Sequence, residues 1–266
     1  MQDNKKFKLV SSKKTRYLLP NILTLGGVCL GISSIKFSID GNFSLAVTLI
    51  LLAAILDALD GRVARLIKGT SEFGKELDSL TDFVSFGIAP VLILYFWDLN
   101  TYGKLGWAIA LVYSVCCVLR LARFNLTKID NQQVWKNNFF EGIPSPAGGV
   151  LVLMPLIYSF SEIQFFNPDY KLVVPILFIT ISILLISKIP TYSLKKIIVP
   201  RSSTIFLLFG IILLFGLLLI FTFKALVIGC LIYILAIPAS IIHYKKQKKI
   251  FANDNKYEEE EPEDVL

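Results

Sequence analysis

The sequence predicts an all-α protein, a polytopic membrane helix bundle built as one domain. Hydrophobic residues make up 55% of the 266 residues, and the mean hydropathy is +0.65. Soluble domains carry about 45–50% apolar residues and roughly 25% charged residues. Here the charged fraction is 18%, and much of it lies at the two ends. The middle of the chain is therefore more apolar than a water-soluble core requires.

Apolar segments follow one another along the chain, and we expect each to be a membrane-spanning helix. A spanning helix needs about 20 mostly apolar residues, and several of these segments are shorter. About eight spans are expected, with six or seven as the alternative. The segments are Ile22–Ile39, Phe43–Leu66, Ser79–Trp97, Trp107–Leu121, Ala147–Tyr158, Val173–Ile186, Ile205–Phe221 and Ala225–Ile242.

Basic residues alternate between the gaps that separate these segments. The N-terminus, the even-numbered gaps and the C-terminal end are rich in lysine and arginine, whereas the opposite gaps hold only Lys104, Lys171 and Lys224. Cytoplasmic loops of membrane proteins carry this excess of positive charge. An even number of spans with both termini in the cytoplasm fits the pattern best.

Three regions follow from this reading. Residues 1–16 form a basic cytoplasmic segment, residues 17–243 form the transmembrane domain, and residues 244–266 form a charged cytoplasmic tail. We expect the part of this tail after Phe251 to be disordered. The N-terminus shows no signal-peptide cleavage site. The net charge of +7 follows the topology, so it indicates anionic membrane lipid as a partner and no nucleic acid.

Four aspartates stand out because charges within a span are costly, at least about 2.5–3.5 kcal/mol each near the centre of a helix. Asp57 and Asp60 lie toward the end of the second apolar segment, and Asp78 and Asp82 lie at the start of the next predicted helix. Each pair has helical spacing that puts both carboxylates on one face. A short turn at Gly69–Gly74 would bring the pairs together.

Four neighbouring carboxylates repel one another unless cations neutralise them. Oxygen ligands suit hard divalent ions, so Mg²⁺ or Mn²⁺ is predicted here. Gly61 and Ala64 share the face of the first pair and leave room for a nucleotide, and Arg65 could take a phosphate. Simple pairing of aspartates with nearby basic side chains would explain one aspartate, but not the whole set.

The spacing D-x2-D-G-x2-A-R-x8-G-x3-D-x3-D, from Asp57 to Asp82, resembles the signature of the CDP-alcohol phosphatidyltransferase family. Its eight fixed residues would coincide by chance about once in 10¹⁰ starting positions. The resemblance implies a six-helix core plus two further helices, a two-metal site and a homodimer. It makes Asp57, Asp60 and Asp78 metal ligands and Asp82 the general base and a further ligand. The CDP group would then contact Asp57, Gly61, Ala64, Arg65, Gly74 and Asp78.

Flanking residues resemble the phosphatidylserine synthase branch of that family. The stretch Ser79–Pro90 carries much of this likeness, together with Leu18–Thr24, Leu119–Asn125 and Gly142–Pro146. The resemblance implies transfer of a phosphatidyl group from CDP-diacylglycerol to L-serine, in a bacterial cytoplasmic membrane, with the active site on the cytoplasmic side. A serine site needs a cation for the carboxylate, so Arg120 or Arg123 is the candidate, with Asn125 or Ser85 nearby.

Several alternatives stay open at this point. Each arginine could be an ordinary topology anchor, and Pro144-Ser145-Pro146 could serve only to break the chain before the fifth span. The same chemistry could use another acceptor, such as glycerol 3-phosphate or inositol phosphate. A cation-coupled transporter is the rival from another class, although the chain shows none of the internal repeats typical of transporters.

Overall fold

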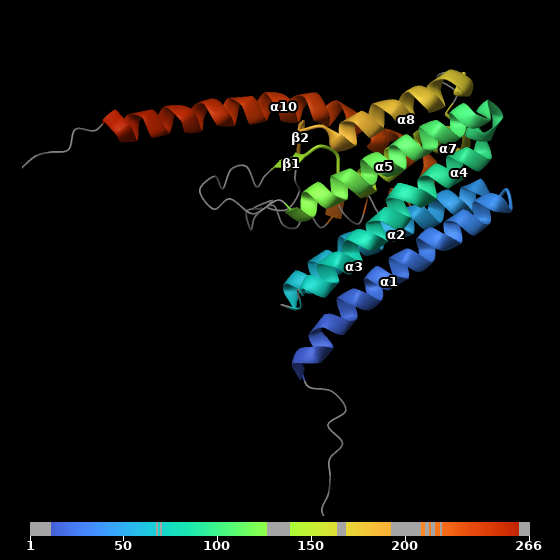
Figure 1. The fold of residues 1–266 in the computed structure, drawn as a ribbon, viewed down its shortest axis with the longest axis horizontal. Coiled ribbons are helices and arrows are strands. Elements are labelled where there is room, and N and C mark those ends of the chain that lie inside the picture. Colours follow the sequence, from blue (N-terminus) through green and yellow to red (C-terminus); the bar gives the residue numbers. More distant parts are fainter. Residues whose placement is uncertain are drawn as a thin grey trace, which may run out of the picture.

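The structure, a computed structural model, is a bundle of helices (Figure 1). It describes residues 12–67, 69, 71–126, 139–163, 169–192, 209–210, 213, 216–218 and 220–260. Most of the predicted basic segment 1–16 lies outside the described residues. The all-α prediction is confirmed, because helices make up nearly all of the described chain.

The first two helices form a long antiparallel pair. Helix α1 spans Ser12–Ile39 and helix α2 spans Phe43–Leu66, and they lie side by side in Figure 1. The turn between them is tight because Gly41 adopts a positive φ of 78°, and Asn42 caps α2 by accepting a hydrogen bond from the backbone N–H of Leu45. The predicted bounds of the second span are those observed.

The third span changes its helix type twice. Helix α3 covers Glu72–Asp82, the π-helix η1 covers Phe83–Ile88, and helix α4 covers Ala89–Trp97. A π-turn inserts an extra residue per turn and is often found at functional sites. Here it begins at the residue that follows Asp82, so it separates the aspartate face from the apolar part of the span.

The remaining described elements complete the bundle. A 3₁₀ turn, η2 (Leu99–Tyr102), leads into helix α5 (Lys104–Leu126). Helices α6 (Ser145–Val152), α7 (Met154–Phe160) and α8 (Tyr170–Ile186) follow, and the last helix is α10 (Thr222–Glu260). Two three-residue strands, β1 (Phe139–Glu141) and β2 (Pro190–Tyr192), pair antiparallel, with Phe140 opposite Thr191.

Several expectations about the later spans need revision. The segment expected at Ala147–Tyr158 is broken at Leu153 into α6 and α7, because Pro155 has no N–H to continue the helix ladder. The segment expected at Ile205–Phe221 lies largely outside the described residues. The predicted disorder after Phe251 is not observed as far as Glu260, because α10 continues to that residue and extends away from the bundle in Figure 1.

Five helices in the described part of the chain are long and apolar enough to cross a membrane. These spans are Leu18–Ile39, Phe43–Leu66, Glu72–Trp97, Lys104–Leu126 and Thr222–Lys248. Large apolar side chains cover the outside of the bundle, whereas a buried core that includes Ile50, Phe86, Tyr113 and Phe178 fills its centre. The chain is an integral membrane protein, and the total of eight spans stays a prediction.

Candidate active site

The end of α2 and the start of α3 bring the aspartates together. Helix α2 carries Asp57 and Asp60, and α3, which packs against α1, carries Asp78 and Asp82. The connection is short because Ser71 caps α3, accepting a hydrogen bond of 3.0 Å from the backbone N–H of Gly74. Carboxylate oxygens of Asp57, Asp60 and Asp78 all lie within 4.8 Å of one another.

Asp82 lies one helical turn after Asp78 on α3. Its side chain is buried, and it interacts electrostatically with both Asp57 and Asp78. Its Oδ2 accepts a hydrogen bond of 3.1 Å from the hydroxyl of Ser145. Its Oδ1 is buried and has no hydrogen-bond partner among the described residues. A buried polar atom without a partner is costly, and the Asp57 carboxyl lies within side-chain hydrogen-bonding reach of Asp82, so a proton or a cation is needed to hold these two acidic groups together.

Helix α1 contributes a direct contact to the cluster. The hydroxyl of Thr24 donates to Asp60 Oδ2 at 2.7 Å, and it also lies 3.0 Å from the carbonyl oxygen of Pro20. Both Thr24 and Asp60 are buried. This bond fixes the orientation of the Asp60 carboxylate, so three helices together build the acidic cluster.

Arg120 brings a positive charge to the same place from α5. Its guanidinium is buried, donates to the hydroxyl of Ser145 and stacks over the ring of Phe124 at 5.4 Å. It interacts electrostatically with Asp82 and with Asp57. The charge of Arg120 partly offsets the negative charge of the cluster.

The other predicted acceptor-site residues have partners other than the aspartates. Arg123 donates to the carbonyl oxygens of Ile186 at 2.6 Å and Ser187 at 3.1 Å, so it caps the C-terminal end of α8. Asn125 and Ser79 form hydrogen bonds with each other at 3.0 and 3.2 Å. The hydroxyl of Ser85, three residues after Asp82, hydrogen-bonds to α1.

Ser85 instead joins two helices. Its side chain is fully buried in η1, and its hydroxyl donates to the carbonyl oxygen of Gly27 on α1 at 3.2 Å. A Cβ on Gly31 would come within 2.7 Å of the Ser85 hydroxyl oxygen. Ser85 therefore has a packing role that its sequence position did not reveal.

The sequence model of the CDP-alcohol phosphatidyltransferase family matches residues 17–242, which is most of the chain and includes all four aspartates. The chain belongs to this family. Relatives named CDP-diacylglycerol–serine O-phosphatidyltransferase come from several bacteria. The protein of Mycobacterium leprae (strain TN) is 42% identical over 187 residues, which are 69% of this chain and 61% of that protein.

Two further relatives carry the same name. The Mycobacterium tuberculosis protein (strain ATCC 25618 / H37Rv) is 44% identical over 148 residues, 54% of this chain and 51% of that protein. The Helicobacter pylori protein (strain ATCC 700392 / 26695) is 35% identical over 181 residues, 68% of this chain and 74% of that protein. The chain thus spans about half to three-fifths of the length of the mycobacterial relatives it matches.

The acidic cluster of this chain fits a divalent cation. All the candidate ligands are carboxylate oxygens, which are the donors that Mg²⁺ and Mn²⁺ prefer. Three of them converge within 4.8 Å, and the unpartnered Oδ1 of Asp82 lies beside them. Arg120 interacts with this cluster, but its single charge cannot balance four carboxylates, so further positive charge is needed to hold them together.

The small residues of the family motif divide into two kinds. A Cβ on Gly61 would meet no atom within 4 Å, so the backbone there is open to an approaching group. A Cβ on Gly74 would lie 3.1 Å from the Ser71 hydroxyl oxygen and 3.3 Å from Asn21 Oδ1, so Gly74 is needed for packing against the helix cap. Ala64 is half-buried, and Arg65 is exposed at the end of α2.

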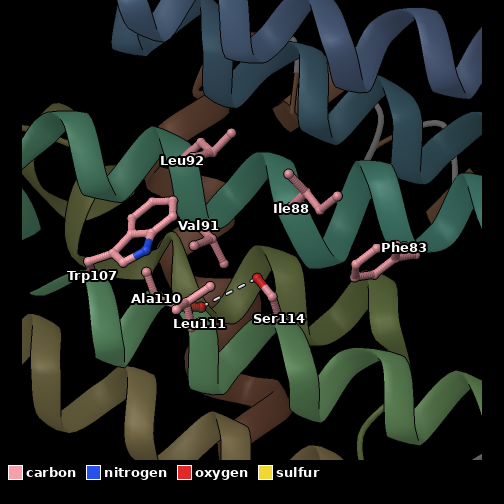
Figure 2. Close-up of a pocket in the computed structure, with 8 residues that line it drawn as sticks. All are labelled: Phe83, Ile88, Val91, Leu92, Trp107, Ala110, Leu111 and Ser114. Carbon is pink, nitrogen blue, oxygen red and sulfur yellow. Dashed lines mark hydrogen bonds between the residues drawn. The ribbon is translucent and has the colours of Figure 1, made fainter.

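A separate pocket of about 300 Å³ lies between the third span and α5 (Figure 2). Figure 2 shows its lining of apolar side chains and the hydroxyl of Ser114, which lies 3.3 Å from the carbonyl oxygen of Ala110. The lining residues are Phe83, Ile88, Val91, Leu92, Trp107, Ala110, Leu111 and Ser114. These walls suit hydrocarbon and offer nothing to bind a nucleotide or an amino acid, so this pocket is not the catalytic centre.

Two site residues were not assigned roles from the sequence. Thr24 hydrogen-bonds to Asp60, which lies 36 residues away along the chain, and Ser145 hydrogen-bonds to Asp82, which lies 63 residues away. Both lie in stretches that resemble the phosphatidylserine synthase branch, which was the one available signal. That signal marked the stretches but could not identify the contacts.

Proposed function

We propose that this chain transfers the phosphatidyl group of CDP-diacylglycerol to L-serine, giving phosphatidylserine and CMP. The carboxylate cluster of Asp57, Asp60 and Asp78 beside the buried Asp82 carries the proposal, because it lies on the family's motif. The names of the relatives support serine as the acceptor. The reaction would serve phospholipid biosynthesis.

The four aspartates are the proposed ligands of two divalent ions, Mg²⁺ or Mn²⁺. Such ions supply charge that neutralises a diphosphate and stabilises a departing phosphate group. Asp57 and Asp78 would contact both the ions and the CDP group. Gly61, Ala64, Arg65 and Gly74 would surround the nucleotide, and the open backbone at Gly61 supports this assignment most directly.

Asp82 is the proposed general base. It accepts the proton of the serine hydroxyl while that oxygen forms a bond to the phosphorus attached to diacylglycerol. The bond between that phosphorus and the oxygen of the CMP phosphate breaks, and CMP leaves with the bonding electrons. The position of Asp82 supports this role, because its Oδ1 is buried and has no hydrogen-bond partner in the described part of the chain.

Arg120 is the proposed partner of the serine carboxylate. Serine is a small molecule, so a cation that binds its carboxylate must lie close to the base that receives its hydroxyl proton. Arg120 meets this condition through its link to Asp82 by way of Ser145. Arg123 and Asn125 remain candidates at the same end of α5, but Arg123 is also the cap of α8, and Ser85 is the least suited because it contacts α1.

The proposed location is a bacterial cytoplasmic membrane, with both termini and the active site on the cytoplasmic side. The positive-inside distribution supports this orientation, and the basic residues on that side suit anionic lipid. A homodimer is proposed on the family resemblance. The mass of the protein in detergent, measured by light scattering, would distinguish a dimer from a monomer.

Competition between acceptors tests the proposal. Purified protein is supplied with CDP-diacylglycerol, Mg²⁺ or Mn²⁺ and labelled serine, and CMP and labelled lipid are measured with and without glycerol 3-phosphate or inositol phosphate. We expect CMP release that requires metal and serine, and label in phosphatidylserine. Metal-dependent CMP release with another alcohol but not with serine would mean that this alcohol, and not serine, is the acceptor. No CMP release with any acceptor would count against the enzyme and favour a transporter.

A further inference from the structure

Ser145 is the first residue of α6, and it lies between a buried base and a buried cation. Its side chain is fully buried. Its hydroxyl accepts a hydrogen bond from Arg120 Nη1 and donates one of 3.1 Å to Asp82 Oδ2. The three residues come from α5, α6 and α3, so one hydroxyl joins three helices at the acidic cluster.

Chemistry fixes the direction of these two bonds. A guanidinium can only donate and an ionised carboxylate can only accept, so the hydroxyl must accept from Arg120 and give its single proton to Asp82. The hydroxyl therefore occupies one carboxylate oxygen, Oδ2, and leaves Oδ1 without a partner among the described residues. The two oxygens of Asp82 are no longer equivalent.

The position of Ser145 is itself held by close backbone contacts. A Cβ on Gly149, one turn along α6, would lie 3.1 Å from Phe86 Cβ on η1. Gly142, just before α6, has a positive φ of 75°, and a Cβ there would lie 2.8 Å from the carbonyl oxygens of Leu185 and Ser187. A side chain held in this way loses little further freedom when its hydrogen bonds form.

We propose that Ser145 is a positioning residue for the transfer reaction. It holds the Asp82 carboxylate so that Oδ1 faces the acceptor hydroxyl, and it holds Arg120 at a fixed place beside that carboxylate. This inference rests on the proposed function. Pro144-Ser145-Pro146 is then part of the active site as well as a break in the chain before the fifth span.

The test compares Ser145→Ala with Ser145→Thr in the full-length protein. With serine as acceptor, we expect Ser145→Ala to lower kcat about 10- to 100-fold, as losses of orienting partners commonly do. The KM for CDP-diacylglycerol should stay within about twofold, because Ser145 does not contact the nucleotide residues. Ser145→Thr keeps the hydroxyl and should recover most of the lost kcat.

The matched control is Ser182→Ala. Ser182 is also a buried serine, but its hydroxyl donates to the carbonyl oxygen of Phe178 in its own helix α8 at 2.7 Å. We expect wild-type kcat from this variant. Tm is measured for all variants, which separates positioning from folding.

The outcomes separate the inference from the proposed function. If the wild-type protein releases no CMP with serine, the proposed function is wrong. The variants are then compared with whichever acceptor the wild type uses. Wild-type kcat in Ser145→Ala would overturn the positioning role. The positioning role would also be overturned if both Ser145 variants lost kcat together with a matching fall in Tm, because that pattern indicates a packing role.

Discussion

Asp82 differs from the other three aspartates in the state of its two oxygens. One oxygen accepts the hydroxyl of Ser145, and the other has no partner within the described residues. Asparagine has the same shape but cannot take up a proton. We expect Asp82→Asn to lower kcat by at least about 100-fold in the CMP-release assay, the scale of general base catalysis.

The control for this variant is Asp40→Asn, which changes an exposed carboxylate at the opposite end of α1. Asp40 forms an ion pair with Lys36 one turn away, and exposed pairs of this kind add little stability. Its activity should match the wild type. Turnover at the parent rate by a folded Asp82→Asn protein would remove Asp82 from the role of base.

Thr24 gives a second test at the scale of single residues. Thr24→Val keeps the shape of the side chain but removes the hydrogen bond to Asp60 Oδ2. Because orienting partners of metal ligands commonly contribute 10- to 100-fold in affinity, we expect the Mg²⁺ or Mn²⁺ concentration for half-maximal activity to rise about tenfold or more. Activity is measured across a metal titration.

Thr48→Val is the matched control on α2. The hydroxyl of Thr48 donates to the carbonyl oxygen of Ser44 in its own helix at 2.9 Å, away from the aspartates. Its metal dependence should equal that of the wild type. An unchanged metal titration for Thr24→Val would mean that the Thr24 bond does not orient a ligand.

Sequence spacing was informative for residues that share a helix and uninformative for residues that do not. Asp57 with Asp60, and Asp78 with Asp82, could be placed on common faces because helical geometry is local. The bonds from Thr24 to Asp60 and from Ser145 to Asp82 join different helices. Arg123 looked equivalent to Arg120 in sequence, and only tertiary packing separates the two.

Among the elements, η1 has close contacts with several neighbours. Gly31 on α1 approaches Ser85 on one side, and Gly149 on α6 approaches Phe86 on another. The hydroxyl of Tyr113 on α5 donates to the carbonyl oxygen of Phe86 at 3.1 Å, which satisfies a polar backbone atom inside the bundle. Small residues allow such close contacts between membrane helices. The segment after Asp82 is therefore held in place from three sides.

Gly31→Val tests this arrangement. A Cβ at this position would lie 2.7 Å from the Ser85 hydroxyl oxygen and 3.1 Å from the Ser85 Cα, so α1 and η1 must separate. Overpacking of this kind costs about 1–3 kcal/mol. We expect a lower Tm in detergent together with reduced activity, because η1 begins directly after Asp82.

The comparison variant is Gly229→Val on α10. A Cβ at Gly229 would meet no atom within 4 Å, so the same substitution in a helix adds no clash there. Its Tm should stay near that of the wild type. Equal Tm values for the two variants would show that the close approach of α1 to η1 does not limit stability.

Helix bounds were predictable where the apolar pattern ends at a turn signal. Phe43–Leu66 begins after Asp40-Gly41-Asn42, and both of its bounds were predicted. The π-helix has no apolar period that distinguishes it from an α-helix over six residues. Strands β1 and β2 have three residues each, too few for an alternating pattern to be seen.

At the scale of the whole molecule, the candidate site lies at one end of the bundle. In Figure 1 the start of α3 and the C-terminal end of α5 point to the same side, where β1 and β2 also lie. The turn at Gly41 and the 3₁₀ turn η2 lie at the other end.

Charge asymmetry predicted this division because it reports the average over many loops. It could not fix the number of spans, since short and broken helices such as α6 and α7 blur the hydropathy signal.

Orientation in the membrane can be tested with two matched substitutions, Lys75→Cys and Lys104→Cys. Lys75 is an exposed residue near the start of α3, at the aspartate end, and Lys104 is an exposed residue at the start of α5, at the opposite end. If the aspartates face the cytoplasm, a membrane-impermeant maleimide should label Lys104→Cys in intact spheroplasts of a bacterial host. Lys75→Cys should be labelled only after the membrane is opened.

The wild-type protein, whose four cysteines all lie within helices, gives the background. Labelling of Lys75→Cys in intact spheroplasts, with Lys104→Cys protected, would place the active site on the outer face and contradict the proposed access of CDP-diacylglycerol and serine from the cytoplasm.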